Sequence, residues 1–109
     1  MPFPFLAGTH VLDLSQFLPG PWAAQVLADL GADVVKIEPP GGDPMRRLGP
    51  RDADGMSPLW KLVNAGKSVV TLDLKSPAGA QALAELIVCA DVLIESYRPG
   101  VLEGLGFAR

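Results

Sequence analysis

The feature that most constrains the fold is a strand–helix–strand pattern in residues 11–38. Residues 11–14 are a short apolar run between turn residues, which predicts a first strand. Residues 20–31 follow with apolar side chains in the one-sided spacing of an amphipathic helix, and Gly31 suits the end of that helix. Residues 33–38 predict a second strand. The block is therefore one βαβ unit, whose two strands are parallel.

The rest of the chain continues the alternation of strands and helices. The expected elements are a loop at 39–57, a short helix at 58–63, a third strand at 68–72, a helix at 76–89, a fourth strand at 91–95 and one or two helical turns at 99–105. The strands look apolar on both faces, which is typical of buried parallel sheets. The predicted fold class is α/β, a Rossmann-like parallel sheet with flanking helices.

Composition limits the function classes. The 109 residues suffice for one small domain, and the balance of 49% apolar and 19% charged residues excludes a disordered segment. No apolar run approaches the roughly 20 residues that cross a bilayer, so no membrane partner is expected. The net charge of −3 argues against a nucleic-acid partner. With no secretory signal and one cysteine, Cys89, which we expect to be a core thiol, the predicted location is the cytoplasm.

Ligands of open parallel sheets bind beyond the carboxyl ends of the strands, which selects four loops here. These loops span residues 15–21, 38–51, 73–75 and 96–100. The first loop has one glycine where a dinucleotide fold has three, so an NAD or FAD site is disfavoured, although Glu38 stands where such folds place a ribose-binding acid.

The basic residues leave two interpretations open. Six of the nine lie in the middle of the chain, as either a solvated loop region or a local anion site. Lys67 and Lys75 bracket the third strand, and each is either a phosphate contact or a solvated surface lysine. A phosphate loop around Lys67 is excluded because a strand follows it. Asp13 is expected to be structural, no metal-ligand spacing is present, and no catalytic constellation is found.

Three blocks of sequence resemble a known family. They are residues 11–15 (VLDLS), 19–21 (PGP) and 27–38 (LADLGADVVKIE) in the first block, 64–75 (NAGKSVVTLDLK) in the second, and 90–101 (ADVLIESYRPGV) with 105–107 (LGF) in the third. Their content and order are similar to the opening of family III CoA-transferases, a group that includes the related α-methylacyl-CoA racemases. The resemblance covers nearly the whole chain.

The resemblance implies that residues 1–109 are the N-terminal CoA-binding part of a larger, Rossmann-like enzyme that forms an interlocked homodimer. Coenzyme A or acyl-CoA would be the substrate, without a metal. The implied contacts are Leu72, Leu74 and Lys75 for the adenine and phosphates, Ser96, Tyr97 and Arg98 for the pantetheine or phosphates, and Phe17, Leu18 and Pro19 for the thioester end. Pro39 replaces an arginine that many members carry, and the segment from Ala65 to Ser68 lacks two of their positive charges.

The same resemblance implies a reaction. CoA would move between acyl groups through an aspartyl acyl intermediate whose aspartate lies downstream of these residues, so the fragment alone is expected to be inactive. Two alternatives stay open from the sequence. One is racemisation of an α-methylacyl-CoA by a downstream acid–base pair, and the other is an inert CoA-binding or structural domain.

Overall fold

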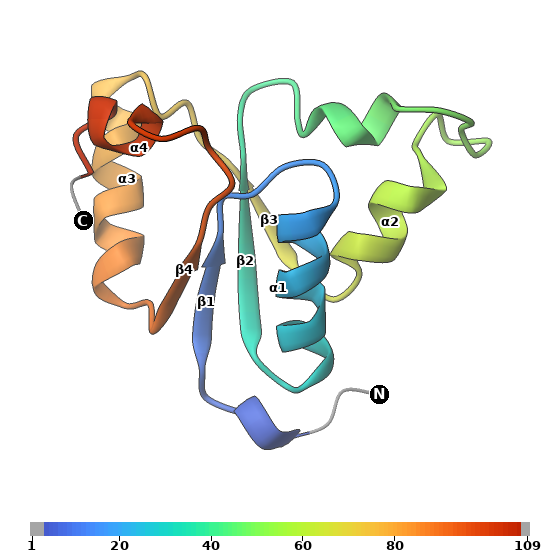
Figure 1. Ribbon diagram of the computed structural model, residues 1–109, viewed down its shortest axis with the longest axis horizontal. Helices are drawn as coiled ribbons and strands as arrows, with labels where there is room; N and C mark the ends of the chain where they lie inside the picture. Colours follow the sequence, from blue (N-terminus) through green and yellow to red (C-terminus); the bar gives the residue numbers. More distant parts are fainter. Residues whose placement is uncertain (1–3, 108–109) are drawn as a thin grey trace.

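Four parallel strands form the centre of the protein, and helices cover both faces of their sheet (Figure 1). The computed structural model describes residues 4–107. The strands are β1 (His10–Asp13), β2 (Asp33–Glu38), β3 (Ser68–Thr71) and β4 (Val92–Ile94). The helices are α1 (Pro19–Asp29), α2 (Pro58–Asn64), α3 (Pro77–Val88) and α4 (Val101–Gly104), with short 3-10 helices η1 (Pro4–Leu6) and η2 (Pro44–Arg47).

The strand order is β3-β2-β1-β4, and every pairing is parallel. Val11 of β1 pairs with Val34 of β2 on one side and with Val92 of β4 on the other. The chain therefore builds outward from β1 in one direction and then returns to add β4 on the opposite side. In open parallel sheets, the carboxyl ends at such a switch point are where ligands bind. The predicted α/β parallel sheet with flanking helices is confirmed.

Side chains that alternate along the strands build one core on each face of the sheet. On the α1 side, Val11 and Val34 pack against small alanine side chains, which let the helix approach the sheet closely. These alanines are Ala24, Ala28 and Ala32. Against α3 and α4, the second core contains Leu12, Leu14, Ile37, Leu83 and Leu102. Figure 1 shows α1 and α2 on one side of the sheet, with α3 and α4 on the other.

Most element boundaries lie within two residues of the predicted ones, and three expectations are wrong. The predicted loop 39–57 contains η2, which begins because the Asp43 side chain accepts a hydrogen bond from the Met45 amide. Cys89 is exposed, since α3 ends at Val88 and the thiol lies just past the packed face of the helix. The strands are not apolar on both faces, because Lys36 lies fully buried within β2.

Helix α3 begins in close contact with the chain that precedes it. The Ser76 hydroxyl caps the helix by accepting a hydrogen bond from the Gly79 amide at 3.0 Å, and it donates to the Asp73 carbonyl at 2.8 Å. A Cβ added at Gly79 would lie 1.9 Å from that same carbonyl oxygen. Glycine is therefore required here by packing, although it is a poor helix former.

We predict that Gly79→Ala destabilises the protein by about 2–3 kcal/mol, because overpacking against the Asp73 backbone outweighs the helix propensity of alanine. Urea denaturation measures the change in the free energy of unfolding. Gly104→Ala in α4 is the matched control, since nothing lies within 4 Å of its added Cβ, and it should be neutral or slightly stabilising. Equal effects of the two substitutions would contradict the packing at α3.

Candidate functional site

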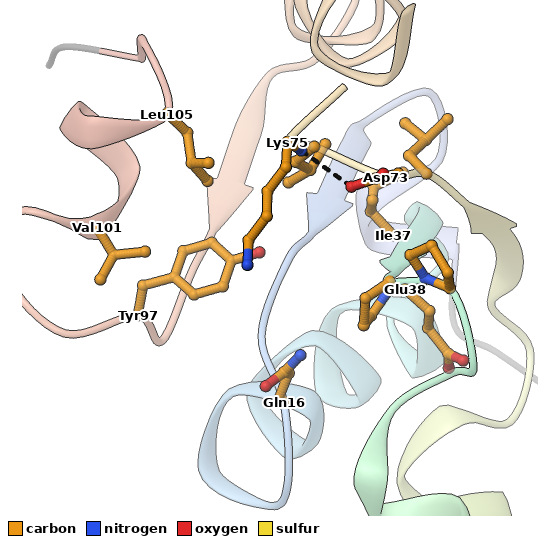
Figure 2. A pocket seen from close by; sticks show the side chains of 12 residues that line it. Gln16, Ile37, Glu38, Asp73, Lys75, Tyr97, Val101 and Leu105 are labelled. Carbon is orange, nitrogen blue, oxygen red and sulfur yellow. Dashed lines mark hydrogen bonds between the residues drawn. The ribbon is translucent and has the colours of Figure 1, made fainter. Parts of the chain in front are cut away.

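A pocket of about 310 Å³ opens at the carboxyl ends of the strands, on the α3 and α4 side of the sheet (Figure 2). Its lining comes from the ends of all four strands and from α4. The lining residues are Gln16, Ile37, Glu38, Pro39, Pro40, Leu72, Asp73, Leu74, Lys75, Tyr97, Val101 and Leu105. The pocket thus lies where an open parallel sheet with this strand order binds its ligand.

The pocket is an apolar slot with few polar groups. Figure 2 shows Ile37 on the side of β2 and β3, and Tyr97, Val101 and Leu105 on the side of β4 and α4. The Lys75 side chain points from the β3–α3 turn toward the side formed by Tyr97, and the Lys75 amide donates a hydrogen bond to Asp73 Oδ1 at 3.1 Å. Apolar walls with few polar groups suit an organic ligand that has a flat apolar part and a charged end.

Lys75 is the free cation of this pocket. Each of the other lysines, Lys36, Lys61 and Lys67, holds at least one carboxylate in an ion pair. Across residues 4–107, Lys75 is the one lysine whose ammonium group makes no hydrogen bond or ion pair within the chain. An unpaired ammonium at the edge of an apolar slot is available to an anionic group of a ligand.

Tyr97 is half-buried at the wall of the pocket. Burial raises the pKa of its phenol above the ordinary value of 10.0, and the nearby negative charge of Glu95 raises it further. The Tyr97 amide donates a hydrogen bond to Glu95 Oε2 at 2.8 Å, which holds the turn after β4 in place. The phenol is therefore a neutral hydrogen-bond donor at physiological pH.

The structure brings together four of the nine side chains predicted for the site. Leu72, Leu74, Lys75 and Tyr97 line the pocket. Ser96 is outside the lining, but its hydroxyl accepts a hydrogen bond from the Gln16 amide at 3.1 Å and so connects the loop after β1 to the end of β4.

The other four predicted side chains lie elsewhere. Arg98 is exposed beyond the pocket, Phe17 is exposed on the loop before α1, and Pro19 is exposed at the first position of α1. Leu18 lines a separate apolar groove between α1 and α2. Among these, Phe17 stands out because its φ of 64° lies in the left-handed region, which a bulky side chain rarely adopts.

Sequence reasoning missed several lining residues. Gln16 and Pro40 stand in loops that the strand-end rule had selected, but no charge or motif distinguished them, and Pro39 was noted only as the replacement of an arginine. Val101 begins α4 and Leu105 directly follows it, and the position of this helix over the pocket depends on tertiary packing of Leu102 in the second core.

Behind the pocket, on the α1 face of the sheet, lies a network of buried charges. Asp13, Lys36 and Asp43 are fully buried, and the side chain of Lys67 has no exposed surface. Lys36 Nζ lies 3.2 Å from Asp43 Oδ2 and 4.0 Å from Asp13 Oδ2, and it donates to the Ser15 carbonyl at 2.9 Å. The two carboxylates and two ammonium groups balance, which is the condition under which charges are tolerated in a protein interior.

Lys67 completes this network. Its ammonium group donates to Asp13 Oδ2 at 2.7 Å, to the Pro21 carbonyl at 2.9 Å and to Asn64 Oδ1 at 2.9 Å. Burial lowers the pKa of Lys67 below its ordinary value, against the opposing effect of the hydrogen bond to Asp13. Both earlier interpretations of Lys67, a phosphate contact and a surface lysine, are therefore wrong, whereas Asp13 is structural as predicted.

A second ion pair holds the chain that follows β2. Arg46 Nε donates to Glu38 Oε1 at 2.6 Å, and the Arg46 guanidinium lies 3.8 Å from the centre of the Trp60 ring. Glu38 also accepts from the Asp43 amide at 3.1 Å. Glu38 Oε1 is thus engaged within the protein, whereas the buried Oε2 has no hydrogen-bond partner within residues 4–107. Lys61 is paired to Asp52 and Asp54, so three of the six central cations, Arg46, Lys61 and Lys67, hold carboxylates in ion pairs.

Within residues 4–107, no group of three or more His, Cys, Asp or Glu side chains is arranged to hold a metal ion. In the same range, no helix has the length and apolar character to cross a membrane.

We predict that the phenol of Tyr97, the only tyrosine in the chain, titrates above pH 10.0 in the folded protein and near 10.0 after unfolding in urea. Near-ultraviolet absorbance of the phenolate measures both midpoints. Because the folded state retains the proton more strongly, this group's contribution to stability is present below pH 10.0 and is lost as the pH rises through the folded-state pKa.

Glu95→Gln is the control for this titration. It should lower the folded-state midpoint only in part, because burial is the larger cause and remains. A folded-state midpoint at or below that of the unfolded chain would contradict the half-buried position of Tyr97.

Several known proteins are similar to this chain in sequence and in architecture. A succinyl-CoA–D-citramalate CoA-transferase from Chloroflexus aurantiacus is 43% identical over 105 residues, which cover 94% of this chain and 26% of that protein. An acetyl-CoA:oxalate CoA-transferase from Acetobacter aceti is 45% identical over 101 residues, covering 92% of this chain and 26% of the relative. The chain thus spans about a quarter of the length of the curated relatives it matches.

Solved structures agree with this similarity. A CAIB/BAIF family protein from Brucella suis superimposes with a TM-score of 0.91 at 37% identity, covering all of this chain and 30% of that one. A Mycobacterium tuberculosis protein superimposes with a TM-score of 0.87 at 41% identity, covering 99% of this chain and 31% of that one. The family model described as CoA-transferase family III matches residues 6–109. The chain belongs to CoA-transferase family III.

Proposed function

We propose that this chain supplies the binding site for the nucleotide end of coenzyme A in an enzyme that transfers CoA between acyl groups. The observation that carries the proposal is the strand-end pocket, which combines apolar walls with one unpaired lysine. A nucleotide ligand presents a flat base and anionic phosphates, and these two features match the walls and Lys75 respectively. The names of the curated relatives supply the CoA thioester as the substrate class.

The pocket suggests where each part of the ligand lies. We place the adenine between Leu72 and Leu74 on one side and Tyr97 on the other, with a phosphate at Lys75. A volume of about 310 Å³ suits one nucleoside and is too small for the whole of CoA, so the pantetheine arm must leave the pocket. Because Ser96 and Gln16 are joined across the sheet, the arm would pass along this connection.

The remaining predicted residues belong to the outer part of the ligand in this proposal. Arg98 would meet a phosphate or the pantetheine from outside the pocket, and Phe17, Leu18 and Pro19 would lie near the thioester. The left-handed conformation of Phe17 supports a functional role for this loop, because such backbone strain is concentrated at ligand-binding segments.

In the reaction we propose, an aspartate carboxylate outside these residues attacks the thioester carbonyl carbon. The carbon–sulfur bond breaks, CoA leaves as the thiolate, and the acyl group remains on the aspartate as an anhydride. The thiolate then attacks the aspartyl carbonyl carbon of the anhydride, so the donor acid leaves as a carboxylate and CoA is held on the aspartate as a thioester. The acceptor carboxylate attacks this thioester and releases the thiolate, which forms a second anhydride. Attack of the thiolate on the acceptor's acyl carbon then gives the new acyl-CoA and frees the aspartate carboxylate. The present residues hold CoA during these steps. The relatives cited here are transferases by name, which favours transfer over racemisation.

We also propose that the complete enzyme is a homodimer and that the α1–α2 face is covered in it. The lining of the groove on this face includes Leu18, Trp22, Leu59 and Leu62. Trp22 is 60% exposed and Leu62 is 68% exposed. Apolar patches of this kind mark interaction surfaces. Sedimentation velocity of the full-length enzyme tests this, and a monomer at micromolar concentration would contradict it.

We predict that Lys75→Ala weakens CoA binding roughly tenfold, which corresponds to about 1.4 kcal/mol, because the phosphate loses its cation. Isothermal titration calorimetry with CoA and with adenosine measures the effect, and adenosine, which has no phosphate, should be insensitive to the substitution. The contribution of Lys75 should also fall at high salt.

Arg51→Ala is the matched control. It removes the same charge from an exposed position outside the pocket, where Arg51 donates only to the Arg47 carbonyl, and it should leave CoA affinity unchanged. If Arg51→Ala weakens binding as much as Lys75→Ala does, attraction by overall charge explains the binding and the assigned pocket is wrong.

A further inference from the structure

Between β1 and α1, residues 14–18 cross the point where the sheet changes direction. Gln16 of this segment forms part of the pocket wall, and its amide donates to the Ser96 hydroxyl across the sheet. Phe17 follows in the left-handed region with a φ of 64°. Among residues 4–107, Phe17 is the one non-glycine residue with positive φ, so the surrounding structure must impose this conformation.

We propose that Lys67 is the positioning residue that imposes it. The ammonium group of Lys67 holds Asp13, at the end of β1, and the Pro21 carbonyl, in the first turn of α1. These two groups lie on either side of the strained segment. Lys67 therefore closes the loop at its base and fixes the distance that the loop must span, although Lys67 itself lies outside the pocket.

Asp13 transmits this constraint to the loop. Its Oδ1 accepts hydrogen bonds from the Ser15 amide, at 2.9 Å, and from the Ser15 hydroxyl, while Oδ2 is held by Lys67. Lys36 donates to the Ser15 carbonyl. Ser15 is thus fixed at its amide, its hydroxyl and its carbonyl, which determines the direction in which Gln16 leaves the strand.

The loop also closes on itself above this base. A Cβ added at Gly20 would lie 2.2 Å from the Ser15 Cβ, so the two ends of the loop are in contact. With Ser15 fixed by Asp13 and Pro21 fixed by Lys67, the intervening residues have one way to join them. All three N–H bonds of the Lys67 ammonium are used, the third by Asn64, so the group cannot turn away without leaving a buried acceptor unpaired.

A purely structural role for Lys67 makes a different prediction. If Lys67 only stabilises the fold, its removal should accelerate hydrogen exchange of the Gln16 amide and of the strand amides by the same factor. If it positions the loop, exchange at the Gln16 amide should accelerate more than exchange in the strands, because local opening of the loop then precedes global unfolding.

The experiment is amide hydrogen exchange by NMR on the double variant Asp13→Asn with Lys67→Met. Removing both charges avoids an unpaired buried carboxylate, so the fold is retained, while the contact to Pro21 is lost. We expect exchange of the Gln16 amide to accelerate about tenfold more than exchange of the Leu12 and Val34 amides. Asn64→Ala is a milder second variant, which should also accelerate exchange of the Gln16 amide more than exchange of the strand amides, by a smaller factor.

Val11→Ala is the control, because it weakens the core on the α1 side, which contains no residue of the segment 14–18 and none of the pocket lining. There, Gln16 and the strand amides should accelerate together. The inference is overturned if the double variant and Asn64→Ala show this same uniform acceleration.

A second readout rests on the proposed function. If the pocket binds CoA, the double variant should bind it about tenfold more weakly, and Val11→Ala, whose core contributes nothing to the pocket lining, should bind it unchanged while folded. Absence of CoA binding by the unsubstituted protein would refute the proposed function alone, because the exchange measurement decides the role of Lys67 without any ligand.

Discussion

The rest of the structure depends on the buried, charge-balanced contacts among Asp13, Lys36, Asp43 and Lys67. Charges in an interior destabilise a protein unless each one is paired and hydrogen-bonded, so these groups constrain one another. They come from β1, from β2, from the segment before η2 and from the turn before β3. One neutral cluster thereby fixes the relative positions of three strands and of the loops at their carboxyl ends.

At the carboxyl ends of the strands, the two faces of the sheet differ in the contacts they make. On the α1 face, ion pairs hold the loops, and Arg46 extends the same principle by binding Glu38 and Trp60. On the opposite face, apolar side chains of the second core continue into the pocket through Leu72, Leu74 and Tyr97. The pocket side is thus left for a ligand, since three of the central cations, Arg46, Lys61 and Lys67, are already paired with carboxylates, whereas Lys75 is left for an anion.

The sequence predicted the elements well, because hydrophobic periodicity and turn residues are local signals. Ser76 followed by a proline predicted the start of α3, and Gly31, with a φ of 101°, ends the turn after α1 as expected. Pairing over long distances has no local signal. Lys67 and Asp13 are separated by 54 positions, and nothing near Lys67 distinguishes a buried ammonium from a solvated one. The same limit applies to Gln16, whose place in the pocket depends on Ser96.

We propose that the strand-end pocket receives the nucleotide end of coenzyme A. The most direct test is an NMR titration of the isotope-labelled chain with CoA, in which chemical-shift changes are mapped residue by residue. We predict the largest saturable changes at Leu72, Leu74, Lys75 and Tyr97, with adenosine reproducing most of them. Changes that concentrate instead at Trp22 and Leu62, in the α1–α2 groove, would contradict the claim.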